Sequence, residues 1–194
     1  MLTASKDNGV KRFVYASSSS VYGDSVELPK VESRTGNLLS PYAVTKYVNE
    51  LYMGVFYKCY GFESIGLRYF NVFGKRQDPN GAYAAVMPKW ISQMLNGEDL
   101  FINGDGETSR DFTYIDNVVQ ANILAGTTTN PDAFAKAYNT AAAGRETLNN
   151  LFHAIKHGLE EKLPELKIKD AIYRDFRAGD IRHSNANIEQ AKEL

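Results

Sequence analysis

Short apolar runs alternate along the chain with longer stretches that have helical periodicity. The run at 13–16 is apolar, and the run at 63–70 contains Ile65, Leu67, Tyr69 and Phe70, which is typical of strands buried in a parallel sheet. Between them, residues 41–60 have an apolar stripe at helical spacing, and we expect this stripe to pack on the sheet. Its members are Val44, Val48, Leu51, Tyr52, Val55 and Phe56. The order strand, helix, strand predicts a parallel pair joined by a right-handed crossover.

The ends of this central helix are marked by three residues. Ser40 is a favourable N-cap, Pro41 suits the first helical position, and Gly61 suits the position just past the end. Residues 1–9 resemble the last turns of another helix that ends near Asn8 and Gly9.

The rest of the chain continues the alternation of strands and helices. Short strands are predicted at 100–103, 137–140 and 171–173. Helices are predicted at 84–96, 116–125 and 147–163, with Asp116 as an N-cap, and another is predicted to begin at Ile188. The pattern predicts an α/β fold with a parallel sheet.

Two polar stretches are candidates for chemistry. The serines at 17–20 follow a predicted strand, and the carboxyl ends of parallel strands are where open α/β sheets bind ligands. Tyr42 and Lys46 are four residues apart on the central helix and therefore share a face. A cation there favours the phenolate form of Tyr42, which could then remove a proton from an alcohol. Taken singly, each feature is common, since many helices have this spacing and many serine runs are turns.

Together these features resemble a known family. Ser18 with Tyr42 and Lys46 resembles the catalytic set of the extended short-chain dehydrogenase/reductase family. The Leu-Arg-Tyr-Phe-Asn-Val-Phe-Gly segment at 67–74 is similar to nucleotide-sugar epimerases and dehydratases. The stretches at 76–90 and 103–111 look most like bacterial UDP-N-acetylglucosamine 4-epimerases.

The resemblance implies a particular organisation of the chain. It implies the carboxyl-terminal part of a Rossmann-type parallel sheet, together with a small α/β lobe that binds substrate. Residues 1–80, with a return segment at about 105–128, would be half of a dinucleotide-binding domain. Residues 81–104 and 129–194 would form the nucleotide-sugar lobe. The 194 residues contain no glycine-rich dinucleotide fingerprint, which relatives have upstream, so we expect a carboxyl-terminal portion.

The activity implied by the resemblance is NAD-dependent epimerisation at C4 of a UDP-hexose through a 4-keto sugar. Tyr42, Lys46 and Ser18 would be catalytic. The implied NAD contacts are Ala16, Ser17, Tyr42, Lys46, Tyr69 and Phe70. In such an enzyme the cofactor supplies the redox chemistry and the protein supplies orientation and electrostatics.

The substrate-binding residues are likewise implied by the resemblance. Arg110 and Arg177 would bind the diphosphate, and Asp180 a ribose hydroxyl. Phe101 could stack on the uracil, whereas Trp90 could equally fill the core. The other implied contacts are Ser18, Ser19, Ser20, Asn71, Ala85, Val86, Lys89, Asn103 and Ser184.

Ser184 is expected to set the choice of sugar. The resemblance places it beside the sugar C2 group, where a small side chain leaves room for an N-acetyl group. The implied substrates are therefore UDP-GlcNAc and UDP-GalNAc.

Two alternatives stay open. One is a nucleotide-sugar 4,6-dehydratase, but dehydratases of this kind have an Asp-Glu pair where this chain has Ser19 and Ser20. The other is that this polypeptide alone is an inactive fragment, because it lacks the helix N-terminus that holds a pyrophosphate.

Composition narrows the function classes further. The formal net charge is −1 and the charges are mixed along the chain, which does not indicate a nucleic-acid partner. Cys59 is the only cysteine, which favours a reducing cytoplasm, and no apolar run is long enough to span a membrane. The histidines at 153, 157 and 183 do not have metal-ligand spacing, so we expect no metal site.

The resemblance also implies a homodimer in the complete enzyme.

Overall fold

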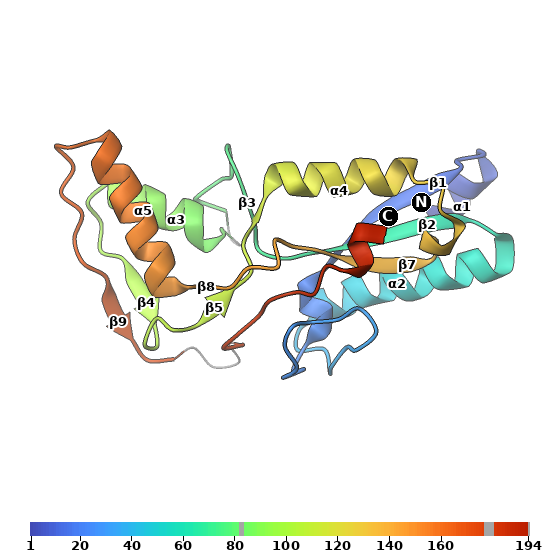
Figure 1. The fold of residues 1–194 in the computed structure, drawn as a ribbon, viewed down its shortest axis with the longest axis horizontal. Coiled ribbons are helices and arrows are strands. Elements are labelled where there is room, and N and C mark those ends of the chain that lie inside the picture. The colour runs from blue at the N-terminus through green and yellow to red at the C-terminus, as the bar shows by residue number, and fades with distance from the viewer. Residues whose placement is uncertain (82–83, 177–180, 194) are drawn as a thin grey trace.

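The larger part of the molecule is a three-stranded parallel sheet with helices on both faces (Figure 1). The computed structural model describes residues 1–81, 84–176 and 181–193. The sheet has the order β1-β2-β7, and its strands are β1 (Arg12–Ser18), β2 (Glu63–Tyr69) and β7 (Lys136–Thr140). Helix α2 (Pro41–Tyr60) covers one face and α4 (Ile115–Thr127) covers the other, while α1 (Leu2–Asp7) precedes the sheet. The predicted α/β class and the parallel pairing of the first two strands are confirmed.

The smaller part contains two helices and a short parallel strand pair. Helices α3 (Val86–Leu95) and α5 (Leu148–Lys162) pack beside β4 (Phe101–Asn103), which pairs with β9 (Ile172–Arg174). The core of this part consists of Trp90, Met94, Leu100, Ile102, Leu151 and Phe152. Burial of such apolar side chains is the main favourable term in its stability.

Two further strand pairs lie between these parts, and the sequence analysis missed both. They are β3 (Val72–Phe73) with β6 (Thr113–Tyr114), and β5 (Ser109–Arg110) with β8 (Glu146–Thr147). The structure also contains short turns of 3-10 helix, namely η1 (Ser19–Tyr22), η2 (Pro131–Ala133) and η3 (Gln190–Glu193).

The predicted ends of α2 are confirmed. The Ser40 Oγ atom accepts a hydrogen bond from the Ala43 N–H at 3.1 Å, and Gly61 has a φ of 63°. The predicted N-cap of α4 is wrong, because Tyr114 occupies that position and Asp116 lies inside the first turn. Strand β6 runs directly into the helix, so no separate turn precedes it in which a side chain could cap.

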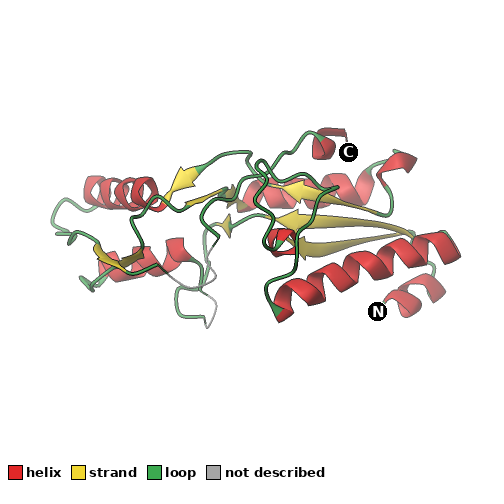
Figure 2. Cartoon of the chain, turned by 90° about the horizontal axis from the view of Figure 1, so that it is seen from below, coloured by secondary structure: helices red, strands yellow, loops and turns green. Residues whose placement is uncertain are grey.

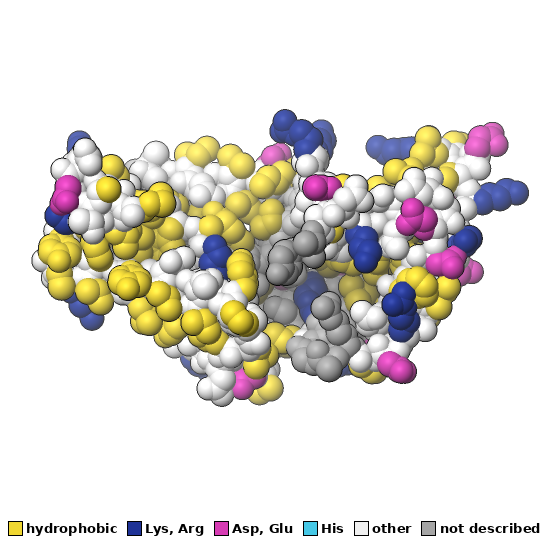
Figure 3. Space-filling model, turned by 180° about the vertical axis from the view of Figure 1, so that it is seen from behind, with side chains coloured by type: hydrophobic (Ala, Val, Ile, Leu, Met, Phe, Trp, Pro, Cys, Tyr) yellow, Lys and Arg dark blue, Asp and Glu magenta, His cyan; other side chains and the backbone are white. Residues whose placement is uncertain are grey.

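The prediction that the apolar stripe of α2 packs on the sheet is also wrong. Leu51 is 53% exposed and Tyr52 is 57% exposed, and Val44, Val48 and Val55 are exposed as well. The side toward the sheet instead contains Ala43 and Met53, which are buried, and Glu50, whose side chain contacts β1 and β2. Figure 3 shows hydrophobic side chains at the surface of this larger part.

The carboxyl ends of the three parallel strands point toward the smaller part (Figure 2). Ser18 ends β1, Tyr69 is its partner at the end of β2, and Thr140 ends β7 beside Tyr69. Strand β7 belongs to this sheet although its residues fall in the range that we assigned from sequence to the sugar lobe.

In the described part of the chain, no helix has the length and apolar character needed to cross a membrane.

Candidate functional site

The serine run leaves β1 and turns sharply at the carboxyl edge of the sheet. The Ser18 Oγ atom accepts the N–H of Ser20 at 3.1 Å and thereby caps the 3-10 turn that follows. Ser17 points the other way, into the interior, with 2% of its surface exposed. Any contact of Ser17 with a ligand would therefore involve its backbone.

Helix α2 places a tyrosine and a lysine beside this strand end. The Lys46 Nζ atom donates to the Ala16 carbonyl oxygen at 3.0 Å and lies 5.6 Å from the centre of the Tyr42 ring. Tyr42 is 55% exposed, so its hydroxyl group is accessible to a ligand. An ammonium group has several N–H donors, and only one is used on Ala16. The predicted catalytic pair thus lies next to the strand that bears Ser18.

A buried ion pair fixes α2 against the sheet. Arg68 of β2 donates from Nε and Nη2 to the two carboxylate oxygens of Glu50, at 2.9 Å and 2.7 Å. The Ser17 hydroxyl group donates to the same carboxylate at 2.5 Å. The side chains of Arg68 and Glu50 are only 5% and 10% exposed. Burial opposes the charge of Arg68, but the hydrogen bonds and electrostatic attraction of Glu50 and Tyr22 together outweigh it and raise the pKa of the guanidinium group.

The same guanidinium group connects to the loop after the serines. Its Nη1 atom donates to the Tyr22 hydroxyl oxygen and to the Glu32 carbonyl oxygen, both at 3.0 Å. The Tyr22 hydroxyl group in turn donates to Asn139 Oδ1 at 2.7 Å. Burial raises the pKa of Tyr22, so this phenol stays protonated and acts as a donor. The network therefore ties β1, β2, β7 and α2 together directly behind Tyr42 and Lys46.

A cavity of about 440 Å³ lies between α3, β4 and the segment after β2. This volume is in the range of small-molecule sites. Eight of the residues that we expected to contact substrate line it, namely Asn71, Ala85, Val86, Lys89, Trp90, Phe101, Asn103 and Arg110. Residues far apart in the sequence are thus brought together, although their individual roles stay predictions.

Asn71 connects this cavity to the strand ends. It follows β2 with a φ of 32°, and its Nδ2 atom donates to the Asp111 carbonyl oxygen at 3.1 Å. The Asp111 carboxylate is fully buried and accepts the N–H groups of Ala142 at 3.0 Å and Ala186 at 3.2 Å. Burial raises the pKa of Asp111 despite these hydrogen bonds. The contacts hold the segment after β2, which carries Asn71, against the segment of Arg110 and Asp111.

Arg110 is oriented by the backbone around it. Its Nη1 atom donates to the Ser109 carbonyl oxygen at 2.9 Å and to the Arg182 carbonyl oxygen at 3.3 Å. Nearby, Ser109 Oγ lies 2.9 Å from His183 Nδ1 and accepts a hydrogen bond from Arg145 Nε at 2.9 Å. Burial and the surrounding arginines lower the pKa of His183, which favours the neutral imidazole.

The other residues predicted to bind cofactor or substrate are not among the described residues that line this cavity. Phe70 is fully buried beside Tyr22, so a contact with nicotinamide would have to use its backbone. The Tyr69 hydroxyl group is bonded to Asn122. The Ser184 N–H donates to the Ser109 carbonyl oxygen at 3.1 Å. The predicted phosphate ligand Arg177 and ribose ligand Asp180 lie outside the described residues.

The sequence analysis missed several residues that line the cavity, including Gln93, Thr108, Phe112, Leu148 and Arg174. Gln93 could have been found, because it lies four residues after Lys89 and so shares its helix face. No pattern in the sequence indicated Arg174. It lies at the cavity because β9 pairs with β4, and this pairing was not predicted.

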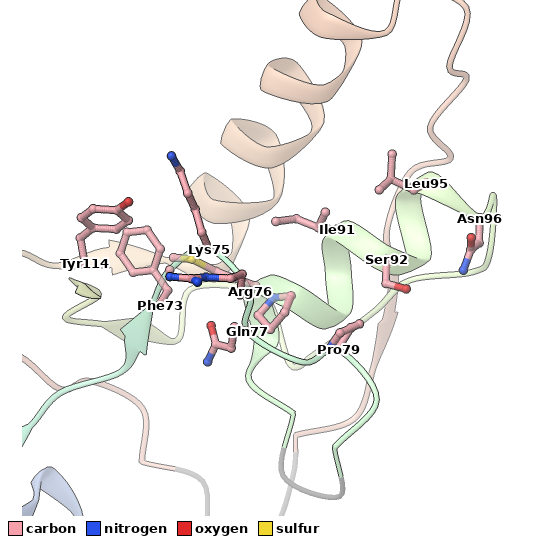
Figure 4. A pocket seen from close by; sticks show the side chains of 13 residues that line it. Phe73, Lys75, Arg76, Gln77, Pro79, Ile91, Ser92, Leu95, Asn96 and Tyr114 are labelled. Atoms are coloured by element: carbon pink, nitrogen blue, oxygen red, sulfur yellow. The ribbon is translucent and has the colours of Figure 1, made fainter. Parts of the chain in front are cut away.

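A larger cavity, of about 590 Å³, lies against another face of α3 (Figure 4). Phe73 and Tyr114 lie at one end and Leu95 and Asn96 at the other. The described residues that line it include no carboxylate, histidine or cysteine, and none of the residues that we expected to contact cofactor or substrate. In the described part of the chain, no cluster of three or more potential ligands could hold a metal ion.

Comparison with known proteins identifies the family. The sequence profile of the NAD dependent epimerase/dehydratase family matches residues 1–141, which is most of the chain. The chain belongs to this family.

Solved structures of family members extend the similarity to nearly the whole chain. A UDP-N-acetylglucosamine 4-epimerase from Methanobrevibacter ruminantium, in complex with UDP-N-acetylmuramic acid, is 42% identical with a TM-score of 0.87 over 98% of this chain. A UDP-glucose 4-epimerase from Thermotoga maritima with UDP-glucose is 36% identical, with a TM-score of 0.87 over 99%. A UDP-glucuronic acid 4-epimerase from Bacillus cereus, with UDP-glucuronic acid and NAD, is 30% identical, with a TM-score of 0.82 over 100%.

The chain is shorter than these family members. It spans 58% of the M. ruminantium enzyme, 59% of the T. maritima enzyme and 58% of the B. cereus enzyme. The ligands of these three structures share a UDP group but differ in the sugar.

Proposed function

We propose that this chain contains the catalytic and sugar-nucleotide-binding residues of an NAD-dependent UDP-hexose 4-epimerase. One observation carries the proposal. The cavity that gathers the predicted nucleotide contacts begins at Asn71, two residues beyond Tyr69, which is the register partner of Ser18. A ligand in that cavity would therefore reach toward the strand end beside which Tyr42 and Lys46 lie.

The proposal includes a division of the chain into two parts. The larger part, built from residues 1–80 and about 105–128 together with β7, would be half of the dinucleotide-binding domain. Residues 81–104 and most of 129–193 would bind the nucleotide sugar. The complete enzyme, by which we mean one that combines these residues with a glycine-rich dinucleotide-binding unit, would be a homodimer.

The residues that α2 and β1 bring together at the end of β1 fit the NAD that the family uses. Lys46 has ammonium hydrogens beyond the one donated to Ala16, and these suit ribose hydroxyl groups. Tyr42 and the backbone of Ser17 would complete the contact. When bound, NAD would accept a hydride from C4 of the sugar and return it to the opposite face.

The residues of the chain would manage the proton and the charge. Tyr42, with the Lys46 ammonium group beside its ring, would take the proton of the C4 hydroxyl group and later return it. Ser18 would donate to the sugar oxygen, and Arg110 would neutralise the diphosphate. Ser19 and Ser20 offer no acid–base pair, so the elimination performed by dehydratases would have no general acid or base there.

The proposal is tested by measuring the interconversion of UDP-GlcNAc and UDP-GalNAc by the complete enzyme. We expect turnover with NAD⁺ and no net reduction of the cofactor. A polypeptide of these 194 residues, assayed alone, is expected to show neither epimerisation nor tight NAD⁺ binding, because half of the dinucleotide site is absent. Turnover by that polypeptide, or its purification with bound NAD, would contradict this division of the site.

Substrate choice gives a separate prediction at Ser184. We expect Ser184→Tyr in the complete enzyme to lose UDP-GlcNAc and UDP-GalNAc while UDP-glucose and UDP-galactose are still converted. The tyrosine ring would fill the volume that an N-acetyl group needs, and steric exclusion discriminates strongly. The ratio of kcat/KM for the two substrate pairs measures the effect. Ser184→Ala is the matched control, since it leaves the volume free, and unchanged efficiency of the tyrosine variant toward UDP-GlcNAc would refute the assignment.

A further inference from the structure

Arg174 lies flat on an aromatic ring in the wall of the candidate nucleotide cavity. Its guanidinium carbon is 3.3 Å from the centre of the Phe101 ring. At that distance the planar group lies directly over the ring, in the stacked geometry that arginine adopts on aromatic faces. Both residues line the cavity, and β9 places Arg174 opposite Asn103 of β4.

In the part of the chain that the structure describes, the guanidinium group has one face and its N–H edge left for a ligand. Among the described residues, the Arg174 side chain has no carboxylate or carbonyl partner, in contrast to Arg68, which binds Glu50, and Arg182, which binds Asp105. Arg174 is exposed, and the Phe101 ring holds its plane in place. A flat cation held this way is suited to stack on a second planar group.

The two aromatic residues that we expected from sequence to contact the uridine, Phe101 and Trp90, are less suited to that task. Phe101, which we expected from sequence to stack on uracil, has a face covered by Arg174. Trp90 is 4% exposed and packs edge-on against Phe152 at 6.4 Å, so its ring belongs mainly to the core.

We propose that Arg174, supported by Phe101, is the surface on which the uracil ring of the substrate stacks. The inference rests on the proposed function, since it requires a uridine nucleotide in this cavity. It adds a three-layer stack of base, guanidinium and phenyl ring, and it leaves the diphosphate to Arg110.

The test separates stacking from simple charge attraction. Uridine and UDP are titrated into the 194-residue chain by calorimetry, for the wild type, Arg174→Ala and Arg174→Lys. Lysine keeps the charge but has no planar face, so stacking predicts that both variants weaken uridine and UDP alike, by about ten-fold or more. Arg34→Ala, which removes an exposed arginine paired with Glu27, is the matched control and should bind both ligands as the wild type does.

Other outcomes overturn the inference in distinguishable ways. If Arg174→Lys binds both ligands normally, or if Arg174→Ala weakens UDP and leaves uridine unchanged, Arg174 is a phosphate contact and the stacking role is wrong. If the wild-type chain binds neither uridine nor UDP, the proposed function itself fails. Because Arg174 is exposed, its variants should keep the wild-type thermal unfolding midpoint, which is measured alongside.

Discussion

Replacement of Tyr42 by phenylalanine is expected to lower turnover of the complete enzyme by about 10²–10⁴-fold, which is the usual cost of losing a general base. The substitution removes only the hydroxyl group. Lys46, which donates to the Ala16 carbonyl oxygen, should keep its position. UDP-sugar affinity should hardly change, because the proposed nucleotide contacts lie in the cavity between α3 and β4.

Tyr52→Phe is the matched control for this substitution. Tyr52 lies on the same helix and is 57% exposed, against 55% for Tyr42, but it belongs to the exposed apolar stripe. Steady-state kcat and the Kd for UDP-GlcNAc are measured for both variants. Wild-type turnover in Tyr42→Phe, or an equal loss in Tyr52→Phe, would contradict the assignment of the base.

The second large effect is expected on stability, at Glu50. Glu50→Gln should lower the free energy of unfolding by about 3–5 kcal/mol, because it leaves the buried guanidinium group of Arg68 without its anionic partner. The Ser17 hydroxyl group would also lose a charged acceptor. Urea unfolding of the 194-residue chain, monitored by circular dichroism, measures the change.

The exposed pair of Glu27 and Arg34 supplies the control for this experiment. Its N···O distance is 2.9 Å, close to the 2.7 Å of the Glu50–Arg68 pair, but its side chains are 51% and 65% exposed. Glu27→Gln should therefore change stability little, since exposed pairs are screened by water. Equal effects of the two substitutions would show that burial of the Glu50 pair has no energetic consequence.

The order β1, α2, β2 was predictable because its signals are local. Ser40, Pro41 and Gly61 mark the ends of α2 through the hydrogen bonds and φ values that a helix terminus requires. The buried face of α2 was not predictable in the same way. A carboxylate normally faces solvent, but Glu50 faces the sheet because Arg68, eighteen residues later, neutralises it there.

The short central strands show a different reason why prediction from the sequence failed. Strands β3, β5, β6 and β8 are two residues long, too short for any hydrophobic period to be visible in the sequence. Their pairing depends on chain segments that are brought together by the surrounding fold. The misplaced cap at Asp116 has the same origin, because the sequence gives no sign that β6 runs directly into α4.

The candidate site was predicted from sequence motifs, so residues outside those motifs were missed. Asn71, Lys89 and Arg110 belong to segments that resemble the family, and the structure brings them to one cavity. Arg174 belongs to no such motif, and its stacking on Phe101 depends on the pairing of β4 with β9. Its position could be recognised only in three dimensions.

The most direct test of the account is a titration of UDP-GlcNAc into the isotopically labelled 194-residue chain, followed residue by residue by NMR. The account predicts saturable shifts at Lys89, Phe101 and Arg110, which line the smaller cavity. The larger cavity is the internal control, and Ile91 and Leu95 on its wall should change little. Shifts confined to those two residues, or no saturable shift at all, would contradict the assignment of the nucleotide-sugar site.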